Sequence, residues 1–177
     1  MGQSLGTAVT FGVAEALITP PNAIELGAII SISGFSHMKE LLSTYHIGGV
    51  IPVLAPLRPY PWAQTFFKQF VYETWESSRR LATLVEKSSN KLQLFILHAQ
   101  NDMEIPSEHS DFLFHAAANA AVGGDEALSM RDVRKHKTTV ELGEEGYVNT
   151  WPVEKCGGKL IQQWVVNWGG ESRSFQI

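Results

Sequence analysis

The chain has 177 residues, of which 44% are hydrophobic and 18% are charged, and its formal net charge is −4. This composition supports one domain with a buried core, and it argues against a disordered polymer and a basic nucleic-acid-binding protein. No apolar run is long enough to cross a bilayer. The single cysteine, Cys156, excludes an intrachain disulfide and a cysteine-rich zinc site. The N-terminus lacks the basic segment of a signal peptide, which favours an intracellular protein.

The chain opens on the motif Gly2-Gln3-Ser4-Leu5-Gly6, which matches the G-x-S-x-G pattern of a nucleophile elbow. In that motif a serine lies on a sharp turn between a strand and a helix, and the glycines let the strand and helix approach closely. The apolar spacing that follows predicts a helix over residues 7–18. Only Met1 precedes the motif, so we expect the strand that enters the turn to be absent and the chain to be truncated.

The middle of the chain begins with a short apolar run over residues 26–32, which suits a strand covered on both faces. A short helix is expected over residues 38–45. The proline-rich residues 48–61 exclude a regular helix or a central strand. An amphipathic helix over residues 62–84 carries many aromatic side chains. These rings are either ordinary core or the lining of a lid over an apolar substrate.

The second half of the chain holds the strongest strand, LQLFILH at residues 92–98. An alanine-rich helix is expected over 111–121, a modest alternating strand over 137–142 and a last amphipathic helix over 159–168. Gly143 and Gly146 flank an acidic pair that we interpret as a solvated turn. Strands that alternate with helices indicate a parallel sheet built from βαβ units, so the predicted fold class is α/β.

Asp102 follows the strongest strand directly. A carboxylate just beyond the C-terminal end of a parallel strand lies where open α/β sheets bind ligands. A serine hydrolase needs a nucleophile, a base and a carboxylate that orients the base, and in α/β-hydrolases these occur in the order serine, acid, histidine. Ser4 and Asp102 fit the first two roles. The alternative for Asp102 alone is a turn residue beside Asn101.

This arrangement resembles the α/β-hydrolase fold family, in particular serine hydrolases of monoacylglycerol- and lysophospholipid-lipase type. The similar segments are the elbow, Ser33-Gly34-Phe35, the acid loop from Leu97 to Asp102 with Ile105-Pro106, and the region of Tyr72, Trp75 and Arg80-Leu81. The resemblance implies one partial α/β-hydrolase domain over residues 1–177, with about three parallel strands, flanking helices and a helical cap-like insert at about 36–85. It covers only the later part of the family's domain.

The resemblance also implies a reaction. Ser4 would attack a carboxylic ester of the acyl-lipid class and form an acyl-enzyme, the Leu5 N–H would stabilise the oxyanion, and Asp102 would orient the base. No cofactor or metal is implied, and no histidine pair has metal-site spacing. By the same resemblance we expect the loop with the second oxyanion donor to be missing, and loss of one donor costs about 10²–10³ in rate.

The base departs from the family pattern. Its histidine should follow Gly169-Gly170, where this chain has Glu171, a poor proton acceptor near its usual pKa of about 4.3. His98 is interpreted as structural, and His37 and His136 are the candidate substitutes. We therefore expect this chain to be inactive, and the alternative function is a lipid- or partner-binding module without turnover. Without upstream strands, residues 26–32 would form an exposed edge through which the chain self-associates.

Overall fold

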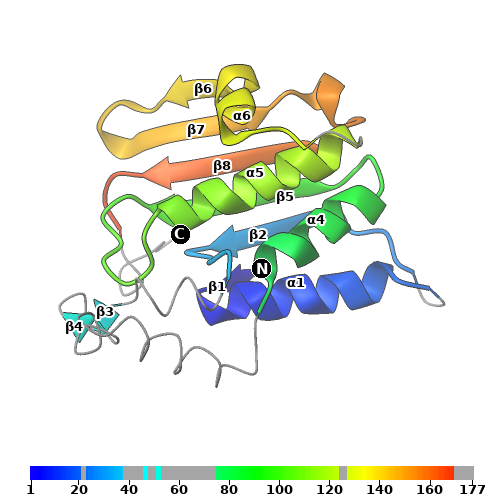
Figure 1. The fold of residues 1–177 in the computed structure, drawn as a ribbon, viewed down its shortest axis with the longest axis horizontal. Coiled ribbons are helices and arrows are strands. Elements are labelled where there is room, and N and C mark those ends of the chain that lie inside the picture. Colours follow the sequence, from blue (N-terminus) through cyan, green and yellow to red (C-terminus); the bar gives the residue numbers. More distant parts are fainter. Residues whose placement is uncertain (21–22, 38–45, 48–50, 53–74, 124–126, 170–177) are drawn as a thin grey trace.

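A six-stranded sheet forms the centre of the structure (Figure 1). The computed structural model describes residues 1–20, 23–37, 46–47, 51–52, 75–123 and 127–169. The strand order is β1-β2-β5-β8-β7-β6. The bounds are β1 Gly2–Gln3, β2 Ala28–Ile32, β5 Gln93–Ala99, β8 Leu160–Val166, β7 Gly146–Trp151 and β6 Thr138–Glu141. β1, β2, β5 and β8 run parallel, and β7 and β6 continue the sheet as antiparallel strands.

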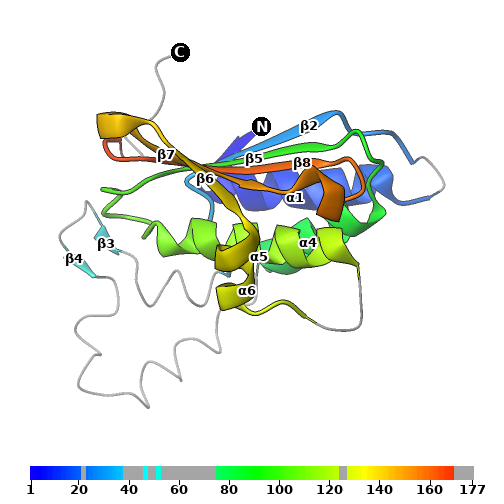
Figure 2. The same cartoon turned by 90° about the horizontal axis from the view of Figure 1, so that it is seen from above.

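All four helices in the described part of the chain lie on one side of this sheet (Figure 2). They are α1 Leu5–Ile18, α4 Ser77–Lys87, α5 Glu108–Val122 and α6 Met130–His136. Between them and the sheet lies the main core, where side chains such as Phe11, Leu81, Leu94, Leu113 and Ile161 are fully buried. Each such side chain stabilises the fold by about 1.5–3 kcal/mol. The core therefore fixes the helices against the strands whose ends carry the site.

Two short 3₁₀ turns flank β7, at Gly143–Glu145 and Val153–Lys155. The first holds the acidic pair, which is exposed as the sequence predicted. A separate antiparallel pair joins β3 His46–Ile47 to β4 Ile51–Pro52. Within the ranges that the structure describes, no helix has the length and apolar character needed to traverse a bilayer.

The sequence predictions hold for most of the elements. α1, β2, β5, α5 and β6 all form where their patterns predicted them, which confirms the α/β class. Two expectations need correction. About three parallel strands were expected and four are present. Residues 2–3 form β1, with Gly2 pairing with Ser31, and residues 160–166 form the parallel β8, whereas the expected strand over 137–142 is the antiparallel β6. The helix expected over residues 159–168 is instead the strand β8.

The error at β8 has a physical reason. One face of a helix could hold Leu160, Ile161, Trp164 and Val165. In a strand, successive residues of the same segment point to opposite faces of the sheet. Ile161, Gln163 and Val165 are buried, while the alternate residues are half-buried. β-branched and aromatic side chains favour a strand, and a short apolar run does not distinguish the two periods. Several expectations lie outside the described residues. They are the helix over 38–45, most of the proline-rich residues 48–61, most of the helix over 62–84 and most of the cap-like insert.

Candidate functional site

Ser4 occupies a strained turn between β1 and α1. Its backbone angles are φ 51° and ψ −126°, and its N–H donates to the Ile32 carbonyl at 2.9 Å. A positive φ is uncommon for a residue with a Cβ, and such strain costs about 1–3 kcal/mol. A Cβ added at Gly2 would lie 2.3 Å from the Gly6 carbonyl oxygen and 2.4 Å from Thr10 Oγ1. Glycine at position 2 is therefore required for the strand and helix to meet at this serine.

The start of α1 adds backbone donors to this turn. The first N–H groups of a helix have no acceptor within the helix, and they favour negative charge. Leu5 is the first residue of α1, so its N–H belongs to this set. The Ser4 side chain makes no capping hydrogen bond, while the Ser4 carbonyl accepts from Thr7 N–H at 3.0 Å and Thr7 Oγ1 at 2.6 Å. The hydroxyl of Ser4 is thus not used to hold the helix.

Asp102 is buried in the loop after β5, with 7% of its surface exposed. Its Oδ1 accepts from the N–H groups of Glu104 at 2.9 Å and Ile105 at 3.0 Å. This Asx-type turn is the structural role that the sequence left open for Asp102. Its Oδ2 is also buried, yet within the described residues it accepts no hydrogen bond. An unsatisfied buried acceptor costs about 1–3 kcal/mol, and more when it is charged.

His98 lies beside this carboxylate but does not pair with it. Nε2 donates to the Ile105 carbonyl at 2.8 Å, which fixes the proton on that nitrogen, and it lies 3.8 Å from Asp102 Oδ2. Burial lowers the pKa of His98 and outweighs the opposing influences of the Ile105 hydrogen bond and the Asp102 charge. Burial thus favours the neutral ring, and the 3.8 Å separation from Asp102 Oδ2 is too long for a hydrogen bond. The expected structural role of His98 is confirmed.

The loops at the carboxyl end of the sheet are tied to one another. This end comprises the residues after β1, β2, β5 and β8, on the left of Figure 1. Ser33 N–H donates to the Leu97 carbonyl and Gln100 N–H to the Val166 carbonyl, both from one strand to the next. Phe35 and Ile105 pack with Ala8 of α1 in a small apolar cluster. Ser4 and Asp102 therefore lie at the same end of the sheet, as predicted.

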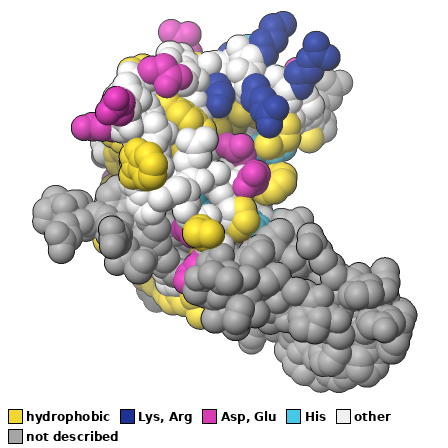
Figure 3. All heavy atoms as spheres, turned by 90° about the vertical axis from the view of Figure 1, so that its left-hand side faces the viewer, with side chains coloured by type: hydrophobic (Ala, Val, Ile, Leu, Met, Phe, Trp, Pro, Cys, Tyr) yellow, Lys and Arg dark blue, Asp and Glu magenta, His cyan; other side chains and the backbone are white. Residues whose placement is uncertain are grey.

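The sheet geometry sets the space between these two groups. Ser4 follows β1 and Asp102 follows β5, with β2 between them. Two inter-strand spacings separate their backbones by about 10 Å. Figure 3 looks onto this end, where acidic and histidine side chains lie among apolar ones. The loop that follows β2 therefore lies between the two groups, where Phe35 packs with Ile105 and Ala8.

The described histidines do not fill that role. His136 lies at the end of α6, and its Nδ1 is 2.8 Å from the Asp132 carbonyl oxygen. The strand that follows it, β6, is three strands away from β5, which carries Asp102 at its end. His37 is half-buried after β2, and no hydrogen bond between it and Asp102 is present. Glu171 lies outside the described residues. The Gly169 N–H donates to Asn101 Oδ1 at 2.9 Å, which places the chain just before position 170 beside the acid loop.

A serine–histidine pair that the sequence did not predict lies at the same end of the sheet. Ser36 Oγ and His109 Nδ1 are 2.9 Å apart, and the Ser36 N–H donates to the same nitrogen at 3.3 Å. Both residues are buried. Their separation of 73 positions gives no sequence signal. The pair connects the loop after β2 to the first turn of α5, and Nδ1 is already an acceptor of the backbone N–H.

No match was found when the chain was compared with protein-family models, curated proteins and solved structures. Within the described ranges, no three His, Cys, Asp or Glu side chains are grouped so as to hold a metal ion.

Proposed function

We propose that this chain carries the nucleophile and acid positions of an α/β-hydrolase-type serine esterase. Ser4 is the nucleophile, the Leu5 N–H is an oxyanion donor and Asp102 orients a base. The observation that carries the proposal is a strained serine and a buried carboxylate with an unused oxygen at the same end of a parallel sheet. Hydrolysis of acyl-lipid esters is the substrate class that the family resemblance favours.

The catalytic step needs a proton acceptor between these groups. A neutral imidazole would take the proton from Ser4 Oγ as that oxygen attacks the ester carbonyl, and its other N–H would donate to Asp102 Oδ2. No described histidine donates to that oxygen. We expect the chain alone to show no ester hydrolysis above a Ser4→Ala variant, because base and nucleophile act as a unit.

Chemical rescue by free imidazole tests the proposal. The protein is treated with a fluorophosphonate probe, which bonds phosphorus to Ser4 Oγ with loss of fluoride, and labelling is read by intact mass and peptide mapping. We expect no labelling without imidazole. With imidazole present, Ser4 should be labelled, and Asp102→Asn should reduce that labelling. Ser36→Ala is the matched control, because it removes a serine at the same end of the sheet without touching the elbow.

Two other outcomes would change the assignment. Labelling of Ser4 without imidazole would show that the chain supplies its own base and is an active hydrolase. Absence of labelling in both conditions would remove the esterase proposal and favour the alternative, a lipid- or partner-binding module without turnover. The observation that supports this alternative is that no described histidine bonds to Asp102 Oδ2, so no base for turnover is found within the described residues.

We also propose self-association through the edge of β2. β1 pairs with β2 only at Ser31 and Ile32, so residues 28–30 have no strand partner on that side within the described residues. The Ser33 N–H points to β5. Successive N–H groups of a strand point to opposite sides, so the N–H of Ala28 points away from β5, to the open edge of β2. Ala28→Pro should block edge pairing without loss of a ladder hydrogen bond. We expect oligomers of the unmodified chain by light scattering and fewer in the variant, and a monodisperse monomer would contradict this.

A further inference from the structure

A small cavity lies on the helix side of the sheet, away from the Ser4–Asp102 site. It has a volume of about 220 Å³ and is bounded by α5, α6, β7 and β8. Its floor and sides combine apolar and charged groups, contributed by Asp111, Phe114, His115, Met130, Val133, Arg134, Lys137, Tyr147 and Gln163. The volume exceeds the roughly 30 Å³ that a water occupies in the liquid several-fold, so the cavity accommodates a small organic molecule.

The cationic groups of this cavity are not neutralised by ion pairs. Lys137 and Arg134 both line it, and neither makes a salt bridge within the described residues. Partial burial lowers the pKa of the Lys137 ammonium, Asp111 opposes that effect, and Arg134 adds to it. Figure 3 shows Lys and Arg side chains gathered over the part of the molecule that holds α6. The cavity thus presents positive charge beside one carboxylate.

The wall behind these cations is rigidly held. Gln163 Nε2 donates to Asp111 Oδ1 at 2.7 Å and to Ser110 Oγ at 2.8 Å, and Gln163 Oε1 accepts from Asn149 Nδ2 at 2.7 Å. Gln163 and Asn149 are fully buried. A buried, connected polar network fixes the side chains that belong to it. Asp111 is therefore positioned before any ligand arrives.

Apolar groups complete the cavity. Phe114 and Val133 are buried, and Met130 is half-buried. A pocket with an apolar lining and a few convergent polar groups is typical of small-molecule sites. Arginine and lysine recognise carboxylates, with arginine forming a fork of two N–H donors. We propose that this cavity binds a small organic carboxylate, with its anionic group at Lys137 and Arg134 and its apolar part against Phe114 and Val133.

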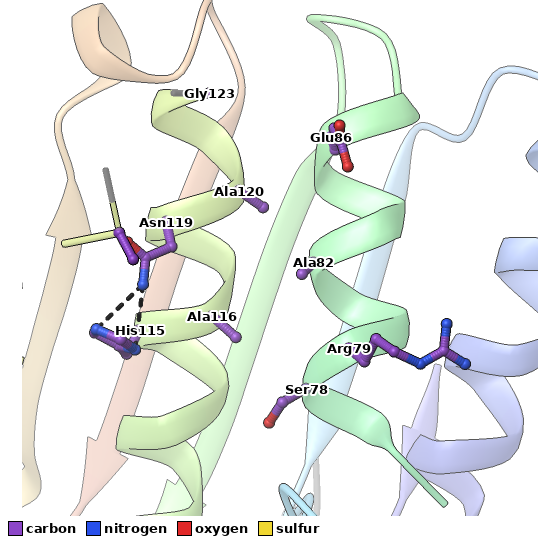
Figure 4. A pocket seen from close by; sticks show the side chains of 10 residues that line it. Ser78, Arg79, Ala82, Glu86, His115, Ala116, Asn119, Ala120 and Gly123 are labelled. Atoms are coloured by element: carbon purple, nitrogen blue, oxygen red, sulfur yellow. Dashed lines mark hydrogen bonds between the residues drawn. The ribbon is translucent and has the colours of Figure 1, made fainter. Parts of the chain in front are cut away.

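The groove between α4 and α5 is larger but does not show the same features (Figure 4). Its volume is about 550 Å³, and its lining includes Ala82, Ala116 and Ala120. The polar Asn119 is already used, because its Oδ1 accepts from the Leu128 N–H at 2.6 Å and its Nδ2 donates to the Leu128 carbonyl at 3.3 Å. Ser78 Oγ is buried in this groove without a hydrogen-bond partner within the described residues, but the lining contains one cationic group, Arg79, and that group already pairs with Glu76.

Fluorine NMR titration of the whole chain with para-fluorobenzoate tests the proposal, which does not depend on the esterase assignment. We expect saturable binding with a Kd of about 1 mM or tighter. The neutral para-fluorobenzamide should bind at least about tenfold more weakly, which corresponds to about 1.4 kcal/mol. This comparison uses the unmodified protein and is independent of any effect of substitution on folding.

Substitutions then locate the site. Lys137→Met and Arg134→Met should each weaken benzoate binding about tenfold, because each removes one cation and keeps an unbranched side chain. Asp111→Asn should tighten it by about threefold, because it removes the neighbouring negative charge. Lys135→Met is the matched control, since Lys135 is on the same helix but does not line the cavity. Absence of saturable binding, equal binding of the benzamide or an equal loss in Lys135→Met would overturn the proposal.

Discussion

Replacement of Ser4 by glycine is expected to stabilise the protein. The strain of a non-glycine residue at φ 51° and ψ −126° is about 1–3 kcal/mol. Glycine is free of that strain but loses about 0.5–1 kcal/mol more conformational entropy on folding. The Ser4 side chain makes no capping hydrogen bond, so little else is lost. The net gain in the free energy of unfolding should be about 0.5–2 kcal/mol, or a rise in Tm of about 1–8 °C for a chain of this size.

Urea denaturation and calorimetry of four proteins measure this gain. Ser4→Ala keeps the Cβ and so should stay near the unmodified chain. Ser129→Gly is the matched control, because Ser129 also precedes a helix but has φ −72° and a side chain that accepts from the Asp132 N–H. It should lose a few tenths to about 1 kcal/mol. If Ser4→Gly loses stability as Ser129→Gly does, the backbone at Ser4 is not strained and the reasoning fails.

Three further perturbations test the surroundings of the site and the sheet. Burial lowers the pKa of His98 below its unfolded value near 6.5. The contribution of His98 to stability is therefore present above about pH 6.5 and is lost as the pH falls toward the folded pKa, by at most about 1.4 kcal/mol per pH unit. His98→Gln should flatten this slope in urea denaturation between about pH 5 and 7. Gly146→Ala should lower the free energy of unfolding by more than about 3 kcal/mol, because the added Cβ would lie 2.0 Å from the Val165 carbonyl oxygen. Gly143 has open space around it, so Gly143→Ala should cost only about 1–2 kcal/mol by the same method. Gln163→Leu should cost about 1–3 kcal/mol in Tm measurements converted to free energy, because it leaves the buried Asn149 Nδ2 without its acceptor, whereas Ser110 Oγ keeps its bond to the Ser107 carbonyl and Asp111 is half-buried. A neutral result would contradict this network.

Local patterns in the sequence were enough to predict much of the sheet. The apolar run at residues 92–98 predicted β5, whose Leu94 and Ile96 are buried toward the helices, while Phe95 and Leu97 on the other face are half-buried. The elbow glycines indicated a close approach, and Gly2 does meet Gly6 and Thr10. β8 could not be assigned in this way, because its apolar residues suit both periods and only pairing with β5 and β7 selects the strand. For this segment the local pattern fits a helix and a strand equally well, and pairing with the neighbouring strands selects the strand.

The candidate site was predictable only in part for the same reason. Ser4 and Asp102 each follow a strand, and parallel topology alone brings both to one end of the sheet. The sequence gives no signal for the Ser36–His109 contact or for the bonds of Gln163 to Ser110 and Asp111, because these join residues more than 50 positions apart. The G-x-S-x-G motif does predict a strained serine, and Ser4 has a positive φ. The unused oxygen of Asp102 within the described residues has no such signal, because it depends on how the loop after β5 packs.

These two features argue together for a chemical role at the carboxyl end of the sheet. A turn at position 102 needs only one side-chain oxygen, which Oδ1 supplies to Glu104 and Ile105, and asparagine would supply it without a buried charge. A turn at position 4 needs only glycine. The chain instead has a strained serine and a carboxylate with a spare oxygen, at a combined cost of about 2–6 kcal/mol in a fold whose total stability is about 5–15 kcal/mol. Packing alone does not explain two separate costs at one end of the sheet, whereas the proposed nucleophile and the proposed acid would use both groups.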